Sequence, residues 1–367
     1  MRRAWLIPLV LLSLIARSLS AQWQANFDLG ASRLEQIGIP ESNAQTLGVI
    51  ADAFVSRFRL VGNSLTARTS ETRWTTQVLG AGSVFGQLGS RMQWELGGIA
   101  SVFAETNAQT ASSAEVIARG YYATARFGSS LALGGGTRRA DAGRQPLGRA
   151  IANVWTNNVA GRFGAEVSHV HTTTTPFADQ NRITLTYTDA SASWRGDFGR
   201  VAGGAAFGVR TSSNAIVPDG GWGSADVTAW ITPRLGLVLS GGQSPQDVVR
   251  GVPRIRYVSG ALRIALQPRV WRALTTVRKS GPNLLATRDG IEIHVAGATK
   301  VELMADFTDW SPVVLTKTGD AWRLERPIPP GLHKLVIRID GGAWAAPVNL
   351  PTATDDLGGV VALVAVP

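Results

Sequence analysis

The sequence predicts an all-β protein, in which an antiparallel β-barrel of roughly 12–14 strands is followed by a small β-sandwich. Three observations lead to this prediction. Apolar and polar residues alternate with a period of two through most of residues 22–267, and clusters rich in Gly, Asn and Asp separate the alternating segments. Alternation then resumes near residue 290 with a different composition. Long helical periodicity is absent, which excludes a helical fold.

The first 21 residues have the pattern of a secretory signal peptide. Arg2 and Arg3 precede an apolar run over residues 4–16, and small residues follow as far as Ala21. The run is too short for a membrane-spanning helix. We therefore expect cleavage after Ala21 and an exported mature chain.

Composition narrows the possible partners. The chain contains no cysteine, so neither a disulfide framework nor a thiolate zinc site is available. Its formal net charge of +10 is compatible with anionic lipid or an acidic polysaccharide. The basic residues are scattered singly through alternating segments, and we therefore expect no nucleic-acid partner.

The segment Arg91–Gly98 illustrates the strands of the first domain. Met92, Trp94 and Leu96 fall on one face, and the polar residues between them fall on the other. The segment Ile183–Thr188 alternates most regularly, but the apolar residues change parity beyond Asp189. That change predicts a bulge or turn at Asp189.

Residues 22–267 resemble outer-membrane β-barrels at the level of pattern, with no diagnostic motif. The resemblance implies an apolar face toward outer-membrane lipid and a polar face toward the lumen. The residues expected to face the lumen are Glu95, Thr184, Thr186, Thr188 and Arg195. Pairing of the strand near Phe27 with the strand near Val258 would close the barrel. The alternative is a soluble β-sandwich, barrel or solenoid with the same alternation turned inward.

No constellation of residues supports catalysis or cofactor binding. His169 and His171 share a strand face, but no third metal ligand with suitable spacing accompanies them. The glycine-rich segment Gly134–Gly136 lacks the lysine of a phosphate-binding loop. Neither a Ser–His–Asp order nor a nucleophile elbow is present. We therefore expect a non-catalytic protein with no metal and no cofactor.

A second domain is predicted at the carboxyl end of the chain. Residues 268–289 are basic and rich in turn formers, which is typical of a linker. Short alternating segments then follow over residues 290–367, punctuated by Gly331, Gly341 and Gly358. This pattern predicts an immunoglobulin-like β-sandwich.

Two tryptophans in this domain are candidates for a binding surface. Trp310 lies in a loop that begins with Asp306, and Trp344 follows the turn Asp340-Gly341. Two flat apolar rings side by side suit the C–H face of a sugar ring.

Residues 290–366 also resemble carbohydrate-binding module family 48, the glycogen-binding domain found in the AMP-activated protein kinase β-subunit. The resemblance is carried by Val301-Glu302-Leu303, Asp306-Phe307-Thr308-Asp309-Trp310, Leu315, Trp322, Pro330-Gly331-Leu332-His333, Ile339-Asp340-Gly341, Trp344 and Asp355-Asp356-Leu357-Gly358-Gly359. Family members bind glucan through two tryptophans, a lysine before the Asp-Gly turn and a Leu-Gly-Thr-x-Asn loop. The resemblance implies that Trp310, Trp344 and Leu357 contact sugar.

The sequence departs from the family pattern at three polar positions. Val336 occupies the position of the lysine, Gly359 that of the threonine and Val361 that of the asparagine. Lys334 and Arg338 share the strand face of Val336, and either is a candidate replacement for the missing cation.

These observations lead to one functional hypothesis and one alternative. The hypothesis is an exported, non-catalytic protein with its barrel in the outer membrane and its carboxyl-terminal domain in the periplasm. That domain binds an α-glucan or an envelope polysaccharide by stacking on two tryptophans. The alternative is a structural outer-membrane barrel whose sandwich is a protein-docking module without sugar binding.

Overall fold

The computed structural model describes residues 22–366 with gaps at strand connections and a few single positions. The gaps are residues 37–38, 56–57, 71–72, 90–91, 107–109, 124–126, 141–142, 159–160, 175–182, 215, 268–282, 288, 296, 343, 348–349, 351 and 355–359. The predicted signal peptide and most of the predicted linker lie outside the described residues. Within the described part of the chain, no helix has the length and apolarity needed to cross a membrane.

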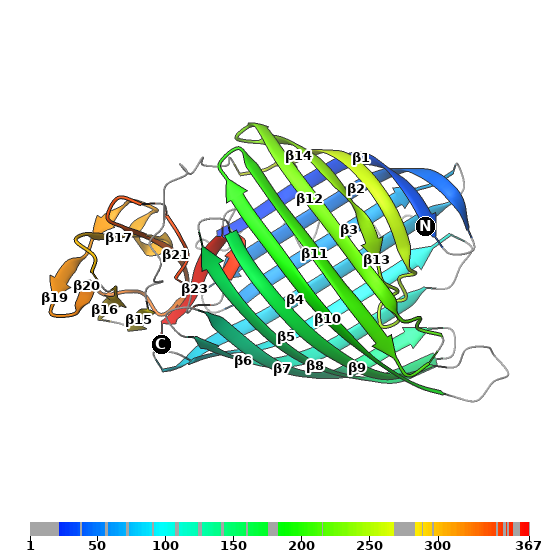
Figure 1. The fold of residues 1–367 in the computed structure, drawn as a ribbon, viewed down its shortest axis with the longest axis horizontal. Helices are drawn as coiled ribbons and strands as arrows, with labels where there is room; N and C mark the ends of the chain where they lie inside the picture. Colours follow the sequence, from blue (N-terminus) through cyan, green and yellow to red (C-terminus); the bar gives the residue numbers. More distant parts are fainter. Residues whose placement is uncertain are drawn as a thin grey trace.

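Strands β1 to β14 form a closed antiparallel barrel in which each strand pairs with its sequence neighbours (Figure 1). The strands are β1 (Gln22–Gln36), β2 (Ile39–Val55), β3 (Phe58–Arg68), β4 (Trp74–Gly89), β5 (Met92–Glu105), β6 (Ala111–Ala123), β7 (Gly128–Ala140), β8 (Gly143–Asn158), β9 (Gly161–Thr174), β10 (Ile183–Phe198), β11 (Val201–Ser212), β12 (Gly220–Thr232), β13 (Leu235–Ser244) and β14 (Ile255–Ala265). β1 pairs with β14, placing Phe27 opposite Ile264 and Arg33 opposite Val258. The predicted closing pair is confirmed.

The outer face of the barrel is apolar. Residues opposite each other in a ladder share a face, and Leu29 lies opposite Leu47 on one side and Leu262 on the other. Side chains on this face are far more exposed than apolar residues in a water-soluble core, with Leu133 reaching 71%. Other exposed apolar residues of this face are Leu60, Val78, Leu96, Val102, Val116, Leu131, Val154, Phe163, Val167, Phe207, Val209, Val227, Leu237, Leu239 and Val258.

The lumen face carries pairs of opposite charges between neighbouring strands. Glu115 accepts two hydrogen bonds from Arg149, and Asp28 accepts two from Arg263. Tyr121 donates to Glu95, and Arg195 lies 3.4 Å from the Asp226 carboxylate. The predicted lumen positions Glu95 and Arg195 are therefore confirmed. Pairing of each charge with a neighbour lets the wall hold ionised groups away from bulk water.

The predicted lumen positions Thr184, Thr186 and Thr188 are wrong. The ladder between β9 and β10 is continuous from Ile183 to Arg195, so the bulge predicted at Asp189 is absent. Thr186 and Thr188 lie opposite His171 and His169 on the outer face. The inward side chains of β10 are apolar here because neighbouring loops cover them.

Two loops fold into the barrel at the end that carries the longer connections. Val217 from the β11–β12 loop and Val248 and Val249 from the β13–β14 loop form a small core with Leu185 and Tyr187. Arg210 of β11 donates a hydrogen bond from Nη1 to the carbonyl oxygen of Gln246 in the β13–β14 loop. This local core reverses the usual preference for polar residues on the lumen face.

The β13–β14 loop also crosses the opening of the barrel. Gly251 in this loop has a φ of +72°, and a Cβ on it would lie 2.4 Å from the Cβ of Ala111 at the start of β6. β6 and β14 are far apart around the wall. The loop therefore spans the lumen at this end.

The carboxyl-terminal module consists of two small sheets. One contains β15 (Asn283–Thr287), β16 (Gly290–His294), β20 (Ala321–Leu324) and β19 (Thr316–Thr318) in that order. The other contains β18 (Val313–Val314), β17 (Val301–Ala305), β21 (Gly331–Ile339), β23 (Val360–Val366) and β22 (Thr352–Thr354). A short 3₁₀ helix, η1 (Asp306–Thr308), follows β17.

Both sheets contribute to one apolar core, which includes Ile293 and Trp322 from the first sheet and Leu303, Leu335 and Val364 from the second. The structure shows these two sheets, and the finer immunoglobulin-like class stays a prediction. β15 lies within the predicted linker, residues 268–289, and pairs with β16. The module therefore includes residues that precede the predicted boundary at 290.

The module lies at the end of the barrel that carries the shorter connections on average, and Figure 1 shows β23 against that end. Residues 199–200 join β10 to β11 there, and residues 233–234 join β12 to β13. β14 also ends there, because Ala265 lies opposite Asn26 near the beginning of β1. The last barrel strand thus ends on the side of the barrel where the module lies.

Close approach of neighbouring backbones makes certain lumen-facing glycines necessary. A Cβ on Gly136 would lie 2.0 Å from the carbonyl oxygen of Ala114 on the adjacent strand. We expect Gly136→Ala to destabilise the barrel by about 1–3 kcal/mol, because the ladder must move to relieve the overlap. Thermal unfolding, followed by the heat-dependent shift in gel migration of the folded barrel, measures the loss.

Gly80→Ala is the matched control, because a Cβ at Gly80 would have no heavy atom within 4 Å. Equal unfolding temperatures for the two variants would contradict the described approach of β6 and β7.

Candidate functional site at the outer face of the five-stranded sheet

Asp306 fixes the loop that carries Trp310. Its Oδ1 accepts hydrogen bonds from the Phe307 amide at 2.7 Å and from His333 Nδ1 at 2.9 Å. Its Oδ2 accepts one from the Lys334 amide at 2.9 Å. One carboxylate therefore joins the 3₁₀ turn to β21, which accounts for an aspartate at the start of this loop.

Trp310 lies at the exposed end of this loop. Its φ of +56° is in the left-handed region, as is that of Asp309 at +51°. Its amide donates to the Ala305 carbonyl at 2.9 Å, which holds the turn closed. The side chain is 36% exposed. The indole is therefore held on a defined backbone and remains accessible to solvent.

Asp340 anchors the second loop in a similar way. Its Oδ1 accepts hydrogen bonds from the amides of Thr299 at 2.7 Å and Lys300 at 2.8 Å. Beyond this turn the chain folds back, and Ala345 forms a bridge with Ile337. Trp344 is carried by this returning segment.

Trp344 packs against Arg338. The Arg338 guanidinium carbon lies 4.6 Å from the ring centroid, which is a cation–π arrangement. The same guanidinium donates two hydrogen bonds of 2.7 Å to Glu302. Arg338 is therefore already engaged by a carboxylate and by one predicted sugar-binding ring.

The two tryptophan loops leave opposite ends of one strand pair. In the β17–β21 ladder, Ala305 lies opposite Leu335 and Val301 lies opposite Ile339. The Trp310 loop follows the first pair, and the Trp344 loop follows the second. The backbone therefore does not start the two loops from a common rim.

The remaining predicted sugar-binding residues lie in different environments. Lys334 is buried, with 2% exposure, and Val336 and Val361 are fully buried. Leu357 and Gly359 lie outside the described residues. Of the predicted set, only Trp310 is both described and well exposed, while Trp344 and Arg338 are half-buried.

The face that includes Val336 contacts the barrel. Its apolar side chains form one cluster with Phe85 of β4 and Tyr121 of β6. The module residues of this cluster are Met304, Leu332, Val336, Trp344, Ala353, Val361, Leu363 and Ala365. Phe85 is 1% exposed. The face predicted to bind sugar therefore packs on the mouth of the barrel.

Two hydrogen bonds cross the same contact. Gln93 Nε2 on β5 donates to the Leu363 carbonyl at 3.4 Å, and Arg162 Nη1 on β9 donates to Thr352 Oγ1. Sequence reasoning missed all four barrel residues of this contact. The available signal was the last strand, Val360–Val366, which is apolar at every position and so predicts burial on both faces.

Two cavities flank the contact, and Arg162 and Thr352 line both. The larger, of about 320 Å³, is also bordered by Arg195 and Asp226. The smaller, of about 160 Å³, is bordered by Glu95. Both cavities are lined by acidic and basic groups together.

His333 is a half-buried titratable group of the module whose two ring nitrogens lie beside hydrogen-bond acceptors. Burial on its own lowers the pKa of this imidazole, but the hydrogen bond and charge of Asp306, with the Pro329 carbonyl at 2.7 Å from Nε2, raise the pKa above its ordinary value. Both ring nitrogens face acceptors, and both therefore donate in the imidazolium form.

Among the described residues, no group of three or more His, Asp or Glu side chains is arranged to hold a metal ion. His169 donates to or accepts from Thr188 at 2.9 Å on the outer face. It is thus an ordinary strand residue in the described surroundings.

Several solved structures match part of the chain at low similarity. CdiB from Acinetobacter baumannii is 8% identical with a TM-score of 0.35, and the match covers 66% of this chain and 60% of that protein. An anion-selective porin from Comamonas acidovorans is 9% identical with a TM-score of 0.35, covering 67% and 99%. A porin refined at 1.8 Å is 8% identical with a TM-score of 0.40, covering 67% and 100%. TM-scores of this size carry no argument about function. No protein-family description and no curated protein sequence matches the chain.

The environment of His333 predicts a pH dependence for the module. A raised folded-state pKa contributes stability that is complete below the unfolded value of about 6.5 and is lost as the pH rises through the folded value. We expect the unfolding temperature of the module to fall over that window in the wild-type chain. The fall should be smaller in His333→Gln, as measured by tryptophan fluorescence at a series of pH values.

His294→Gln is the matched control, because His294 lies exposed on β16 beside Glu292. It should keep the wild-type dependence. An unchanged pH profile in His333→Gln would contradict the assignment of an imidazolium at this position.

Proposed function

We propose that the chain is a non-catalytic outer-membrane barrel that holds its carboxyl-terminal module on the periplasmic side. The observation that carries this proposal is the large number of exposed apolar side chains on the outer face of a closed barrel with a charged lumen. A water-soluble protein rarely exposes so large an apolar surface, whereas lipid requires it. Closure also pairs every strand edge, which the hydrocarbon region demands.

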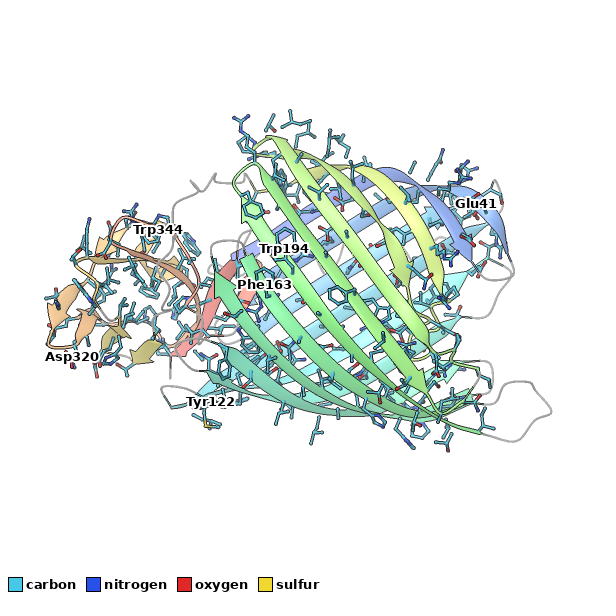
Figure 2. All side chains as sticks on the ribbon, viewed as in Figure 1. Glu41, Tyr122, Phe163, Trp194, Asp320 and Trp344 are labelled. Atoms are coloured by element: carbon cyan, nitrogen blue, oxygen red, sulfur yellow. The ribbon has the colours of Figure 1, made fainter. Side chains whose placement is uncertain are left out.

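Aromatic side chains at the tight-turn end support the same proposal. Tyr122, Phe163 and Trp194 lie on the outer face toward the end nearest the module (Figure 2). Trp194 also stacks on Phe198, with ring centroids 6.1 Å apart. Aromatic girdles of this kind mark the level of the lipid headgroups in outer-membrane barrels.

The direction of the strands supports a periplasmic module. Outer-membrane barrels have short turns on the periplasmic side and longer loops outside. Here the start of β1 and the end of β14 lie at the module end, and the long connections from β11 to β12 and from β13 to β14 lie at the other end. The module and both ends of the barrel domain therefore belong to the periplasmic side in this proposal.

Saccharide binding by the module is a second candidate, favoured by the exposure of Trp310. Its ligand would be an α-glucan or an envelope polysaccharide that stacks on this one indole. Packing of Lys334 and Val336 at the barrel contact leaves fewer polar partners than the family pattern provides. Only weak binding is therefore expected.

The membrane proposal predicts a cost for charge on the outer face. Leu133→Arg should destabilise the barrel by about 2–4 kcal/mol, because arginine at mid-membrane depth must enter lipid. The variant should show less heat-modifiable folded protein in the membrane fraction of the cell.

Val314→Arg is the control, because Val314 is an exposed apolar residue of the module. In a soluble barrel both positions would face water, and both substitutions would be tolerated. Wild-type behaviour of Leu133→Arg, or recovery of the chain in the soluble fraction, would exclude the membrane assignment.

Binding of the full chain in detergent to glycogen or maltoheptaose tests the second candidate. Trp310→Ala removes a stacking contact of roughly 0.5–1.5 kcal/mol, and we expect a two- to tenfold loss of affinity. Trp310→Phe, which keeps an aromatic ring, should retain most of the binding. Absence of binding by the wild-type chain would leave the architectural role alone.

A further inference from the structure

The five-stranded sheet of the module carries apolar side chains on both faces, although its outer face also holds the buried Lys334 and the ion pair between Glu302 and Arg338. Its inner face belongs to the module core, in which Ala362 and Val364 pack with the other sheet. Val361, Leu363 and Ala365 alternate with them and point outward. We call the outward residues Leu332, Val336, Val361, Leu363 and Ala365 the plug face. No described strand of the module covers it.

The barrel covers the plug face from inside its own mouth. Phe85 and Tyr121 belong to the lumen side of the wall, since Phe85 shares a row with Glu95 and Tyr121 with Gln93. Both pack against the plug face. The hydrogen bonds from Gln93 and Arg162 extend the contact to β5 and β9. The module therefore occupies the opening, and does not merely lie beside the rim.

We propose that the module is a reversible plug, which closes the tight-turn mouth when docked and opens the lumen to the periplasm when it leaves. This proposal rests on the proposed membrane barrel and adds the regulation of its lumen. The occupant of the mouth is the chain's own module, seated through the plug face.

The composition of the contact fits a plug that can leave. Gln93 Oε1, Asn153 Oδ1 and Trp155 Nε1 are buried near the contact and have no hydrogen-bond partner among the described residues. Buried polar atoms without partners weaken an interface because they lose their hydration on docking. The two flanking cavities further reduce the packed area.

The module has what it needs to remain folded after it leaves. Its core comes from its own two sheets and includes no barrel residue. The loops that carry Trp310 and Trp344 are fixed by Asp306 and Asp340, which also belong to the module. Undocking therefore exposes the plug face without dismantling the core.

The length of the connection allows the module to clear the mouth. β14 ends at Ala265 and β15 begins at Asn283. Residues 266–282, if fully extended, span about 55 Å. That reach is about the length of the longest barrel strand, β2, so the number of residues between β14 and β15 does not confine the module to the opening.

A cross-link between the plug face and the wall tests the proposal in the full chain. The wild-type sequence contains no cysteine, and a Phe85→Cys, Leu363→Cys double variant therefore carries the only reactive thiols. β4 and β23 are in contact, and a short bismaleimide joins them in the docked state. Conductance is measured in planar lipid bilayers before and after cross-linking.

We expect the double variant to conduct before cross-linking, with an open probability at least tenfold above that of the cross-linked sample. The wild-type chain treated with the same reagent controls for non-specific effects. An equal open probability of the double variant before and after cross-linking, whether high or zero, overturns the plug.

A second variant weakens docking without new thiols. Gln93→Ala with Arg162→Ala removes both described hydrogen bonds to the module and should raise the open probability above the wild-type value. Asn63→Ala, further along the lumen face, is the matched control and should leave it unchanged.

Different outcomes overturn the membrane assignment and the plug. A chain recovered in the soluble fraction overturns the membrane assignment, and the plug with it. The plug alone is overturned if the chain inserts in the membrane and its conductance is the same with and without the cross-link, and the same in the docking variant as in the wild-type chain.

Discussion

The ladder between β1 and β14 is the interaction on which the rest of the structure depends. It joins residues more than two hundred positions apart in sequence and converts a long meander into a tube with no free edge. Only after this closure do the alternating faces become an outside and an inside. The apolar rows then face outward, and pairs such as Asp28 with Arg263 cross the closing seam inside. A wall without edges also gives the module a mouth of fixed shape.

Much of this could be predicted from alternation, because side-chain parity is a local property of a strand. The strands of the barrel follow from that rule. Its closure by the segments near Phe27 and Val258 does not, because the same alternation is compatible with a sandwich. Parity failed in β10 because two loops fold into the lumen and cover Leu185 and Tyr187. The period of a strand indicates which side chains share a face, but it does not indicate whether loops from distant parts of the chain will cover that face.

The candidate site was harder to predict, because the relevant contact joins two domains. Sequence reasoning found Trp310, which the structure leaves exposed, and assigned Lys334 to a ligand, although the structure buries it. Asp306 and Asp340 stand out in the sequence, and the structure gives both a role in fixing loop backbone. Motif residues of this kind preserve a fold whether or not a sugar is bound. Phe85 and Gln93 carried no signal of their own, since nothing local distinguishes them from other lumen residues.

The last strand has a consequence for assembly. β23 lies between β21 and β22, so the five-stranded sheet stays incomplete until residues Val360–Val366 have joined it. These residues are apolar on both sides of the strand. One side packs in the module core, and the other is covered only by the closed barrel. Folding of the module by itself therefore leaves one side of β23 exposed to water, and the barrel must close before that side is covered.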